Sequence, residues 1–276
     1  MGTWKQGKLF MRPRTKAMQT ESEGTGITLQ DLLRAPHERR RIGLLLLLLT
    51  LTAAWIDMLS YLSLGRVWAS FMTGDILFIG LGVAESNSGL VIRALVAVLI
   101  FLVGVAFGSF CLAHASQQQT GPAWHHTFAR YLLMEWLLLL VYAILWQVTG
   151  NLSQQAGVQL LLLCLAALGM GIQGALVLAF NIPGVVADAL TGTLITLGQL
   201  LAQGLGHRGP ERQEWGWSST FLALLCLIYV ASALIVALTS AFILTTVVPV
   251  IVVTIAIFAL LFPFRQAVRS PPTSSS

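Results

Sequence analysis

Several ionisable and hydroxyl side chains lie in a stretch of this sequence that is otherwise apolar. The stretch covers residues 57–84 and contains Asp57, Ser60, Thr73 and Asp75. An aspartate at the centre of a membrane helix costs about 3 kcal/mol on insertion scales, so it persists where it faces a bundle interior or a water-filled cavity. Side chains of these types at this spacing therefore predict a pathway for a solute or an ion.

Further polar groups follow in later apolar stretches, at Glu135, Gln173, Asp188 and Thr191. No Lys or Arg lies in the middle of a predicted span to neutralise the acids, so we expect these to be protonated, hydrated or paired with a bound cation. Each state is compatible with proton or cation coupling. The residues expected along the pathway are Asp57, Ser60, Thr73, Gly74, Asp75, Glu135, Gln173, Thr191 and Gly192.

The same residues have structural alternatives. Asp57 or Glu135 could hydrogen-bond a neighbouring helix and only fix its packing. Thr73 and Thr191 could bond back to the backbone of their own helices, and Asp188 could cap the start of a helix. The sequence leaves both interpretations open.

The composition places these residues in a membrane. The chain has 276 residues, of which 56% are hydrophobic and 10% charged, and its mean hydropathy is +0.80. Soluble domains carry about 25% charged residues. The apolar runs, such as 44–49 and 247–262, are continuous rather than alternating, so we expect an all-α integral membrane protein.

Eight transmembrane spans are expected from runs of about 20 apolar residues, of which the second and sixth are the shortest and could be tilted or partly re-entrant. With both termini in the cytoplasm, fourteen of the 16 Lys and Arg residues fall on that side, in agreement with the positive-inside rule. The predicted spans are 43–62, 67–84, 91–113, 129–149, 158–180, 185–203, 218–239 and 243–263. The predicted parts of the chain are a basic disordered cytoplasmic arm, two four-helix repeats and a cytoplasmic tail, at 1–42, 43–149, 158–263 and 264–276.

An internal repeat relates the two halves. Residues 67–84 and 185–202 share Val, Ala, Thr-Gly, Gly and Ala at matching places, and upstream of the copies Asp57 stands where Gln173 does. Four predicted spans separate the copies, so both should run in the same direction. The sequence therefore predicts two parallel repeats related by an axis along the membrane normal, as in some transporters.

The residues of this repeat also resemble a known family. An acidic residue followed by S-Y-L-S-L-G, F-M-T-G-D, G-I-Q-G-A and L-T-G-T-L is similar to the YoaK family of bacterial membrane proteins, over roughly residues 43–263. That family is a domain of unknown function, so the resemblance implies a multi-span inner-membrane protein and supplies no substrate or reaction. This chain has Asp75 where the family usually has asparagine.

Small residues at helical spacing predict close helix contacts. Gly104 and Gly108 form one such pair, and Ala167, Gly171 and Ala175 form a stripe in a later span. Small residues let helices approach closely in membranes. Packing within the monomer is the expected role, and a dimer face is the alternative.

Motifs for catalysis or metal binding are lacking in the sequence. We find no hydrolase elbow, zinc-protease motif, phosphate loop or dinucleotide fingerprint, and the three cysteines have no metal-ligand spacing. We therefore expect no enzyme, cofactor, metal or nucleic-acid partner. The leading hypothesis is an inner-membrane transporter or permease of a small solute, with its pathway between the repeats. The alternative is a non-transporting scaffold or accessory protein, and the oligomeric state stays open.

Overall fold

The computed structural model describes residues 36–116, 124–149, 155–180, 190–206, 211–239 and 246–261. No strand occurs within these ranges, which confirms the predicted all-α class. Residues 1–35 of the predicted arm and the tail 264–276 lie outside them. The helices are α2 (Pro36–Ser63), α3 (Met72–Ala84), α4 (Ser88–Ser116), α5 (Trp124–Thr149), α6 (Ala156–Ala179), α7 (Leu190–Gly206), α8 (Glu211–Thr239) and α9 (Val248–Leu261).

Five of these helices, α2, α4, α5, α6 and α8, are long and apolar enough to cross a membrane. The apolar parts of the other three are shorter, at Met72–Ala84, Leu190–Ala202 and Val248–Leu261. The 13 residues of α3 give a length of about 20 Å, whereas the hydrocarbon core is about 30 Å thick. Each of the eight predicted spans overlaps one of these eight helices, although α3 by itself is shorter than a full crossing.

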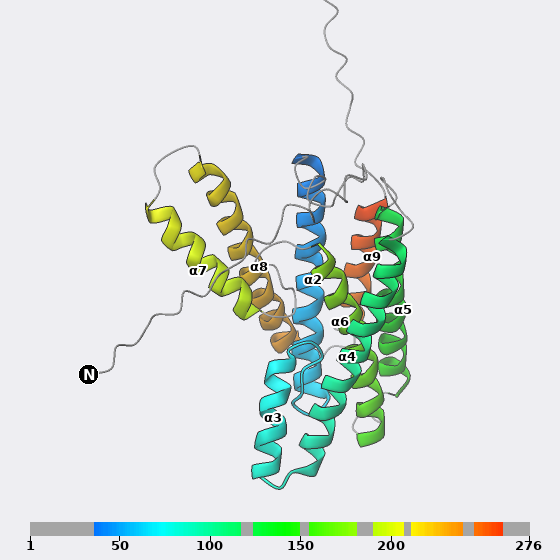
Figure 1. Cartoon of the computed structure of the whole chain (residues 1–276). Helices are drawn as coiled ribbons and strands as arrows, with labels where there is room; N and C mark the ends of the chain where they lie inside the picture. The colour runs from blue at the N-terminus through cyan, green and yellow to red at the C-terminus, as the bar shows by residue number, and fades with distance from the viewer. Residues whose placement is uncertain are drawn as a thin grey trace, which may run out of the picture.

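An antiparallel pair of helices, α2 and α6, lies at the centre of the bundle (Figure 1). The Gln173 side chain of α6 donates to the Leu49 carbonyl of α2 at 2.9 Å, and Gln159 donates to the Ser63 carbonyl at 3.4 Å. Residue numbers thus rise along one helix as they fall along the other, which fixes the antiparallel direction.

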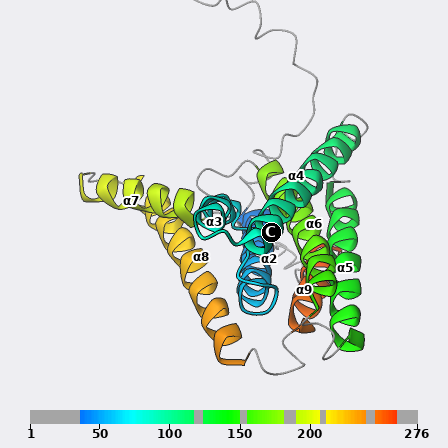
Figure 2. The ribbon, with the colours of Figure 1, turned by 90° about the horizontal axis from the view of Figure 1, so that it is seen from below.

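The remaining long helices pack around this pair. α4 and α5 pack on α6, whereas α8 and α9 pack on α2, and α5 also contacts α9. From below, α7 and α8 lie on one side of α2 while α5 and α9 lie on the other (Figure 2). α3 packs on α4, and α7 packs on α8.

Small residues bring α4 and α6 into backbone contact. A Cβ built at Gly104 would lie 2.5 Å from the Leu168 carbonyl oxygen, and one at Gly108 would lie 2.9 Å from the Ala175 Cβ. The contacts move to higher residue numbers on both helices together, so α4 and α6 run parallel. The small-residue stripes therefore pack within the monomer, as predicted.

α3 runs parallel to α2 instead of crossing back beside it. The Tyr61 ring near the end of α2 stacks on Trp68 at 4.5 Å and lies 6.4 Å from Phe78 in the middle of α3. Asp57, one turn earlier in α2, bonds to the backbone just before α3. The chain thus turns back into the bundle after α2 and then leads out again along α3 (Figure 1).

The two copies of the Thr-Gly segment consequently run in opposite directions. In Figure 1, α3 runs in the direction of α2 and α7 runs in the direction of α6, and α2 and α6 are antiparallel. The expectation of two parallel repeats does not match this arrangement. Because α3 does not cross, only α4, α5 and α6 lie between the copies, and an odd number of crossings reverses the direction.

The start of the first described helix lies beside the end of the last. The Arg41 Nε of α2 donates to the Ala259 carbonyl of α9 at 2.9 Å, and its guanidinium also donates to the Leu260 carbonyl. A cation at the C-terminal end of a helix satisfies otherwise unbonded carbonyls. Both ends of the described chain therefore lie at one end of the bundle.

The eight predicted spans put Arg93 on the cytoplasmic side and Arg130 outside, and the observed helix directions exchange these two positions. Arg130 near the start of α5 joins Arg40 and Arg41 at one end, and Arg93 near the start of α4 joins Arg66 at the other. Most of the basic residues in the described helices still gather at the end where α2 begins. From the positive-inside rule we expect that end to lie in the cytoplasm.

Reporter insertions test this topology. A tag inserted after Ser116 should lie in the cytoplasm, and one inserted after Thr149 should lie outside, because α5 leads away from the arginine-rich end. Protease protection in right-side-out and inverted vesicles measures both. The opposite result at the two positions would restore a full crossing for residues 67–84 and contradict the fold.

Candidate functional site

Residues 64–71, which we call the re-entrant segment, leave the helical conformation inside the bundle. Gly65 has φ of 93° and Arg66 has φ of 65°, the left-handed conformation that ends a helix and reverses the chain. Leu64 and Val67 are fully buried. Buried backbone amides without a helical partner need another acceptor, and the segment finds its acceptors in two carboxylates.

Asp57 of α2 supplies most of these acceptors. Its Oδ1 accepts from the backbone N–H groups of Ala69 at 3.0 Å and Ser70 at 2.7 Å. Its Oδ2 accepts from the Ser70 hydroxyl at 2.7 Å and the Tyr229 hydroxyl of α8 at 3.0 Å. Four donors offset part of the cost of burying the carboxylate. Asp57 therefore fixes the re-entrant segment and joins it to a helix of the second half.

Asp75 supplies the next acceptor along the segment. Its Oδ1 accepts from the Trp68 backbone N–H at 3.0 Å, so three consecutive amides are held by two carboxylates. Asp75 is fully buried in the first turn of α3, and its Oδ2 has no hydrogen-bond partner among the described residues. Because Asp75 lies eight residues into the predicted span 67–84, the sequence predicts that it lies near the membrane midplane. The structure places it at the start of a short helix, beside residues bonded to Asp57.

The site holds two buried carboxylates and no cation paired with them among the described residues. The carboxylates of Asp57 and Asp75 are close enough to interact, and both are buried. Arg93 is the nearby basic residue of α4, but its guanidinium lies against Gly65, and within the described part of the chain its buried Nε has no partner. A buried anion without a cation is costly. The site can therefore take up a proton or another positive charge.

Metal ligands do not accumulate here. No group of three or more His, Cys, Asp or Glu side chains that could hold an ion occurs among the residues with a described placement. Asp57 uses both of its oxygens for hydrogen bonds, so one unbonded carboxylate oxygen remains. That arrangement gives no coordination shell for a resident metal.

Aromatic rings enclose the first Thr-Gly pair. A Cβ built at Gly74 would lie 2.6 Å from the Phe71 ring and 3.0 Å from the Trp68 ring, and these two rings meet edge to face at 6.0 Å. Gly74 therefore lets α3 approach the re-entrant segment. Thr73, by contrast, is exposed on α3 and does not join the polar cluster.

Leucine at Gly74 should destabilise the protein by about 1–3 kcal/mol, because a larger side chain overpacks this contact. Gly80 on the same helix is a matched control, since a Cβ there meets nothing within 4 Å. Thermal melting in detergent should separate Gly74→Leu from Gly80→Leu. Equal melting temperatures would mean that the aromatic contact is not formed.

Other predicted site residues lie apart from this cluster. Ser60 is fully buried one turn after Asp57, and its hydroxyl has no described partner. Gln173 is buried at the level of Leu49, and its Oε1 also lacks a described partner. Along α2, Leu49 precedes Asp57 by about 12 Å at the ordinary helical rise. Gln173 thus lies nearer the end where α2 begins.

Glu135 also lies toward that end of the bundle. It is fully buried on α5, next to Trp136, whose indole donates to Thr254 of α9 at 2.8 Å. Thr254 precedes Leu260, the partner of Arg41, by about 9 Å of helix. With the eight predicted spans and a cytoplasmic N-terminus, the span 129–149 begins outside, and the sequence predicts Glu135 in its outer half. Because α5 runs outward from the arginine-rich end, Glu135 lies in the opposite half and away from Asp57.

The second Thr-Gly pair lies in the first turn of α7. Thr191 is exposed there, as Thr73 is on α3, and Gly192 is half-buried. The adjacent Thr193 is buried instead. Asp188 lies outside the described residues. Of the predicted pathway residues with a described placement, Asp57, Gly74 and Asp75 meet at the re-entrant segment, and the others do not.

Two residues that hold the re-entrant segment were not predicted from the sequence. Ser70 lies within a stretch assigned to a helix, so its backbone was expected to bond within that helix. Tyr229 lies in an apolar run of α8. A buried tyrosine hydroxyl usually finds a hydrogen-bond partner. A tyrosine in this apolar run therefore indicates that a polar group lies within its reach.

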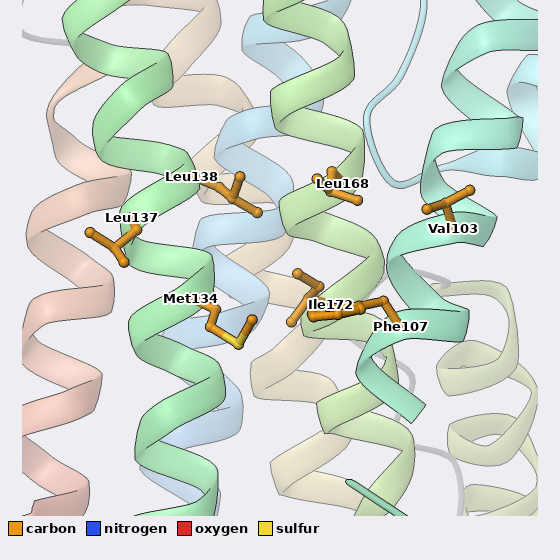
Figure 3. Close-up of a pocket in the computed structure, with 7 residues that line it drawn as sticks. All are labelled: Val103, Phe107, Met134, Leu137, Leu138, Leu168 and Ile172. Atoms are coloured by element: carbon orange, nitrogen blue, oxygen red, sulfur yellow. The ribbon is translucent and has the colours of Figure 1, made fainter. Parts of the chain in front are cut away.

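A groove on the outer surface of the bundle contains none of these residues. It has a volume of about 450 Å³ and is lined by side chains of α4, α5 and α6 (Figure 3). The lining is entirely apolar: Val103, Phe107, Met134, Leu137, Leu138, Leu168 and Ile172. Such a surface suits lipid chains, and it offers no polar group to orient a solute.

The fold and the site define a multi-pass helical membrane protein with a buried non-helical segment between two of its helices. Comparison with known proteins agrees with this class. Residues 45–261 match the family described as a protein of unknown function (DUF1275), and the chain belongs to that family.

A relative from Bacillus subtilis (strain 168), the UPF0700 transmembrane protein YoaK, is 30% identical over 194 residues. The match covers 70% of this chain and 82% of that protein. The resemblance seen in the sequence motifs is thereby confirmed. No solved structure matches significantly.

Proposed function

We propose that this protein is a secondary transporter or permease of a small solute, with its pathway between two halves of inverted topology. The observation that carries the proposal is the re-entrant segment held by Asp57 and Asp75. Lipid-exposed backbone does not leave the helical conformation at membrane depth, and irregular backbone there lines a cavity or is buried in protein. Broken helices of this kind form binding sites in many transporters.

The packing pattern supports the inverted relation. If α2 to α5 correspond to α6 to α9, then α4 on α6 corresponds to α8 on α2, and α3 on α4 corresponds to α7 on α8; all four contacts are present. The central pair of α2 and α6 also fits this relation. In the repeat, Gln173 of α6 corresponds to Asp57 of α2, and Gln173 bonds to Leu49 of that same helix α2. Inverted halves allow a site to open to either side by exchange of their conformations.

The location of the polar groups favours a charged or protonatable passenger in the pathway. Asp57 and Asp75 lie in the first half, and Gln173 takes the matching place in the second. Coupling to protons or cations, placement in the bacterial inner membrane and the absence of an enzymatic reaction belong to the same proposal. A scaffold protein would need the buried carboxylates only for packing.

Cysteine accessibility separates a transporter from a static scaffold. In a background in which Cys111, Cys164 and Cys226 are replaced by serine, Ser60→Cys and Thr50→Cys place single thiols at buried positions about 15 Å apart along α2. A transporter should expose the thiol of the Ser60→Cys variant to an impermeant reagent from outside, and that of the Thr50→Cys variant from the cytoplasm.

The control is Leu139→Cys, because Leu139 is buried in the apolar core. Its thiol should stay unreactive from both sides. If the thiols at positions 50 and 60 are as unreactive as the one at 139, the two halves do not exchange and the scaffold function is favoured.

A further inference from the structure

We propose that the coupling ion is a proton and that Asp75 carries it on Oδ2 in the closed arrangement of the re-entrant segment. This inference rests on the proposed transport function and adds the identity of the ion and of the residue that binds it. Three observations support it: the bonding of Asp75, the contrast with Asp57, and the lack of ligands for a larger ion.

The bonding of Asp75 suits a neutral carboxylic acid. Oδ1 accepts one hydrogen bond, from the Trp68 amide at 3.0 Å, as the carbonyl oxygen of a protonated acid would. Oδ2 is buried and meets neither a donor nor an acceptor among the described residues, and a neutral O–H without a partner costs less there than a charge. An ionised oxygen in that position would be shielded from bulk solvent and would have no partner among the described residues, which is costly. A proton on Oδ2 removes the charge without any rearrangement.

Asp57 provides the contrast. Its two oxygens accept four hydrogen bonds, which favour the ionised form. A negative Asp57 nearby in turn disfavours a second negative charge on Asp75. The two aspartates thus divide the roles, because one holds the segment as an anion and the other is free to gain or lose a proton.

Among the residues whose placement is described, no cation compensates a charge on Asp75. The elements packed against α3 bring Asp57 and Tyr61 from α2, Arg66 from the re-entrant segment and Arg93 from α4. Arg66 is exposed, and Arg93 lies against Gly65. No ion pair to Asp75 forms within the described part of the chain. A metal cation needs several oxygen ligands, about six to eight for Ca²⁺, whereas a proton needs one.

The step is a simple proton transfer. When the segment is open, a hydronium ion in the water at the outer face gives a proton to the Asp75 carboxylate. An O–H bond of the hydronium ion breaks to leave a neutral water, and an O–H bond forms on Oδ2. Burial of the neutral acid then closes the segment, because Trp68 N–H and Oδ1 can bond without an uncompensated charge. Loss of the proton on the other side restores the anion, which favours the open, hydrated arrangement.

Infrared spectroscopy of the purified full-length protein tests the proposal without a substrate. Aspartate labelled with ¹³C at the side-chain carboxyl shifts the carbonyl band of protonated aspartate but not that of glutamate. We expect a shifted band in the wild type that disappears as the pH rises. The band should be lost in Asp75→Asn and kept in Glu85→Gln, a control at the exposed end of α3. A wild type without this band overturns the proposal.

Stability against pH gives an independent readout. The neutral acid stabilises the closed segment, so the melting temperature of the wild type should fall as the pH rises. Asp75→Asn keeps the Oδ1 acceptor and cannot ionise, so its melting temperature should lose most of this pH dependence. Equal pH dependence in the two proteins contradicts the proposal.

Exchange of sodium chloride for choline chloride at constant pH distinguishes the two kinds of ion. If sodium raises the melting temperature of the wild type but not that of Asp75→Asn, then the coupling ion is a metal cation and the proton assignment is wrong. These measurements need no flux. A failure of the transport proposal, with no solute moved, therefore remains distinguishable from a failure of the proton assignment.

Discussion

Alanine at Asp57 should cause one of the largest losses of stability in this protein. The change removes the acceptor of two backbone amides and two hydroxyls at once. Each buried group left without a partner costs about 1–3 kcal/mol. Because the segment relaxes toward water, we expect a total loss of at least about 3 kcal/mol, measured by thermal melting in detergent.

Two further variants grade this effect. Tyr229→Phe removes one of the four hydrogen bonds and should cost about 1 kcal/mol. Asp57→Asn keeps Oδ1 but turns an amide toward the two hydroxyls, and it should fall between the other two variants. A loss of stability that decreases in the order Asp57→Ala, Asp57→Asn, Tyr229→Phe supports the role of Asp57 as the anchor of the re-entrant segment. An Asp57→Ala protein that melts with the wild type would refute it.

Substitution of Gly171 should have the second large effect. A Cβ at this position would collide with the Phe101 carbonyl oxygen and lie 2.9 Å from the Val105 nitrogen, so the obstacle is the backbone of α4. Side chains can rotate away from a clash, but helical backbone cannot. Gly171→Ala should cost about 1–3 kcal/mol, and Gly171→Leu should prevent close contact of α4 with α6.

The control lies two residues away on the same helix. A Cβ at Gly169 meets only Leu138 at 3.8 Å, which is ordinary contact. Alanine there should be neutral or stabilise α6 by up to about 1 kcal/mol, because alanine favours the helical conformation more than glycine does. Opposite signs for the two alanine variants are therefore expected. A Gly171→Ala protein as stable as Gly169→Ala would show that the helices do not touch there.

The helical class and several buried polar residues could be predicted from the sequence. Continuous apolar runs indicate membrane helices, and acidic residues within them must be buried or hydrated. Asp57, Asp75, Glu135 and Gln173 are all buried, as that argument requires. Their burial alone does not determine which of them lie together.

The direction of the segments could not be predicted from hydropathy. Residues 67–84 are apolar enough to be read as a span, but the carboxylates of Asp57 and Asp75 bind the amides of residues 68–70 and keep them out of a helix. One missing crossing reverses every later helix. That reversal moved Glu135 to the opposite half and turned the expected parallel repeat into an antiparallel arrangement. The glycines of α4 and α6, in contrast, were predictable because their spacing alone indicates close packing.

The most direct test of the proposed function is uptake by purified protein in liposomes. Vesicles would be given a mixture of isotope-labelled metabolites under an inward proton gradient, and their contents measured by mass spectrometry. The proposal predicts at least one solute that accumulates above its external concentration with the wild type. That accumulation should collapse with a protonophore and be absent with Asp75→Asn. If no solute enters faster than it enters protein-free liposomes, the protein is not a transporter of the kind proposed.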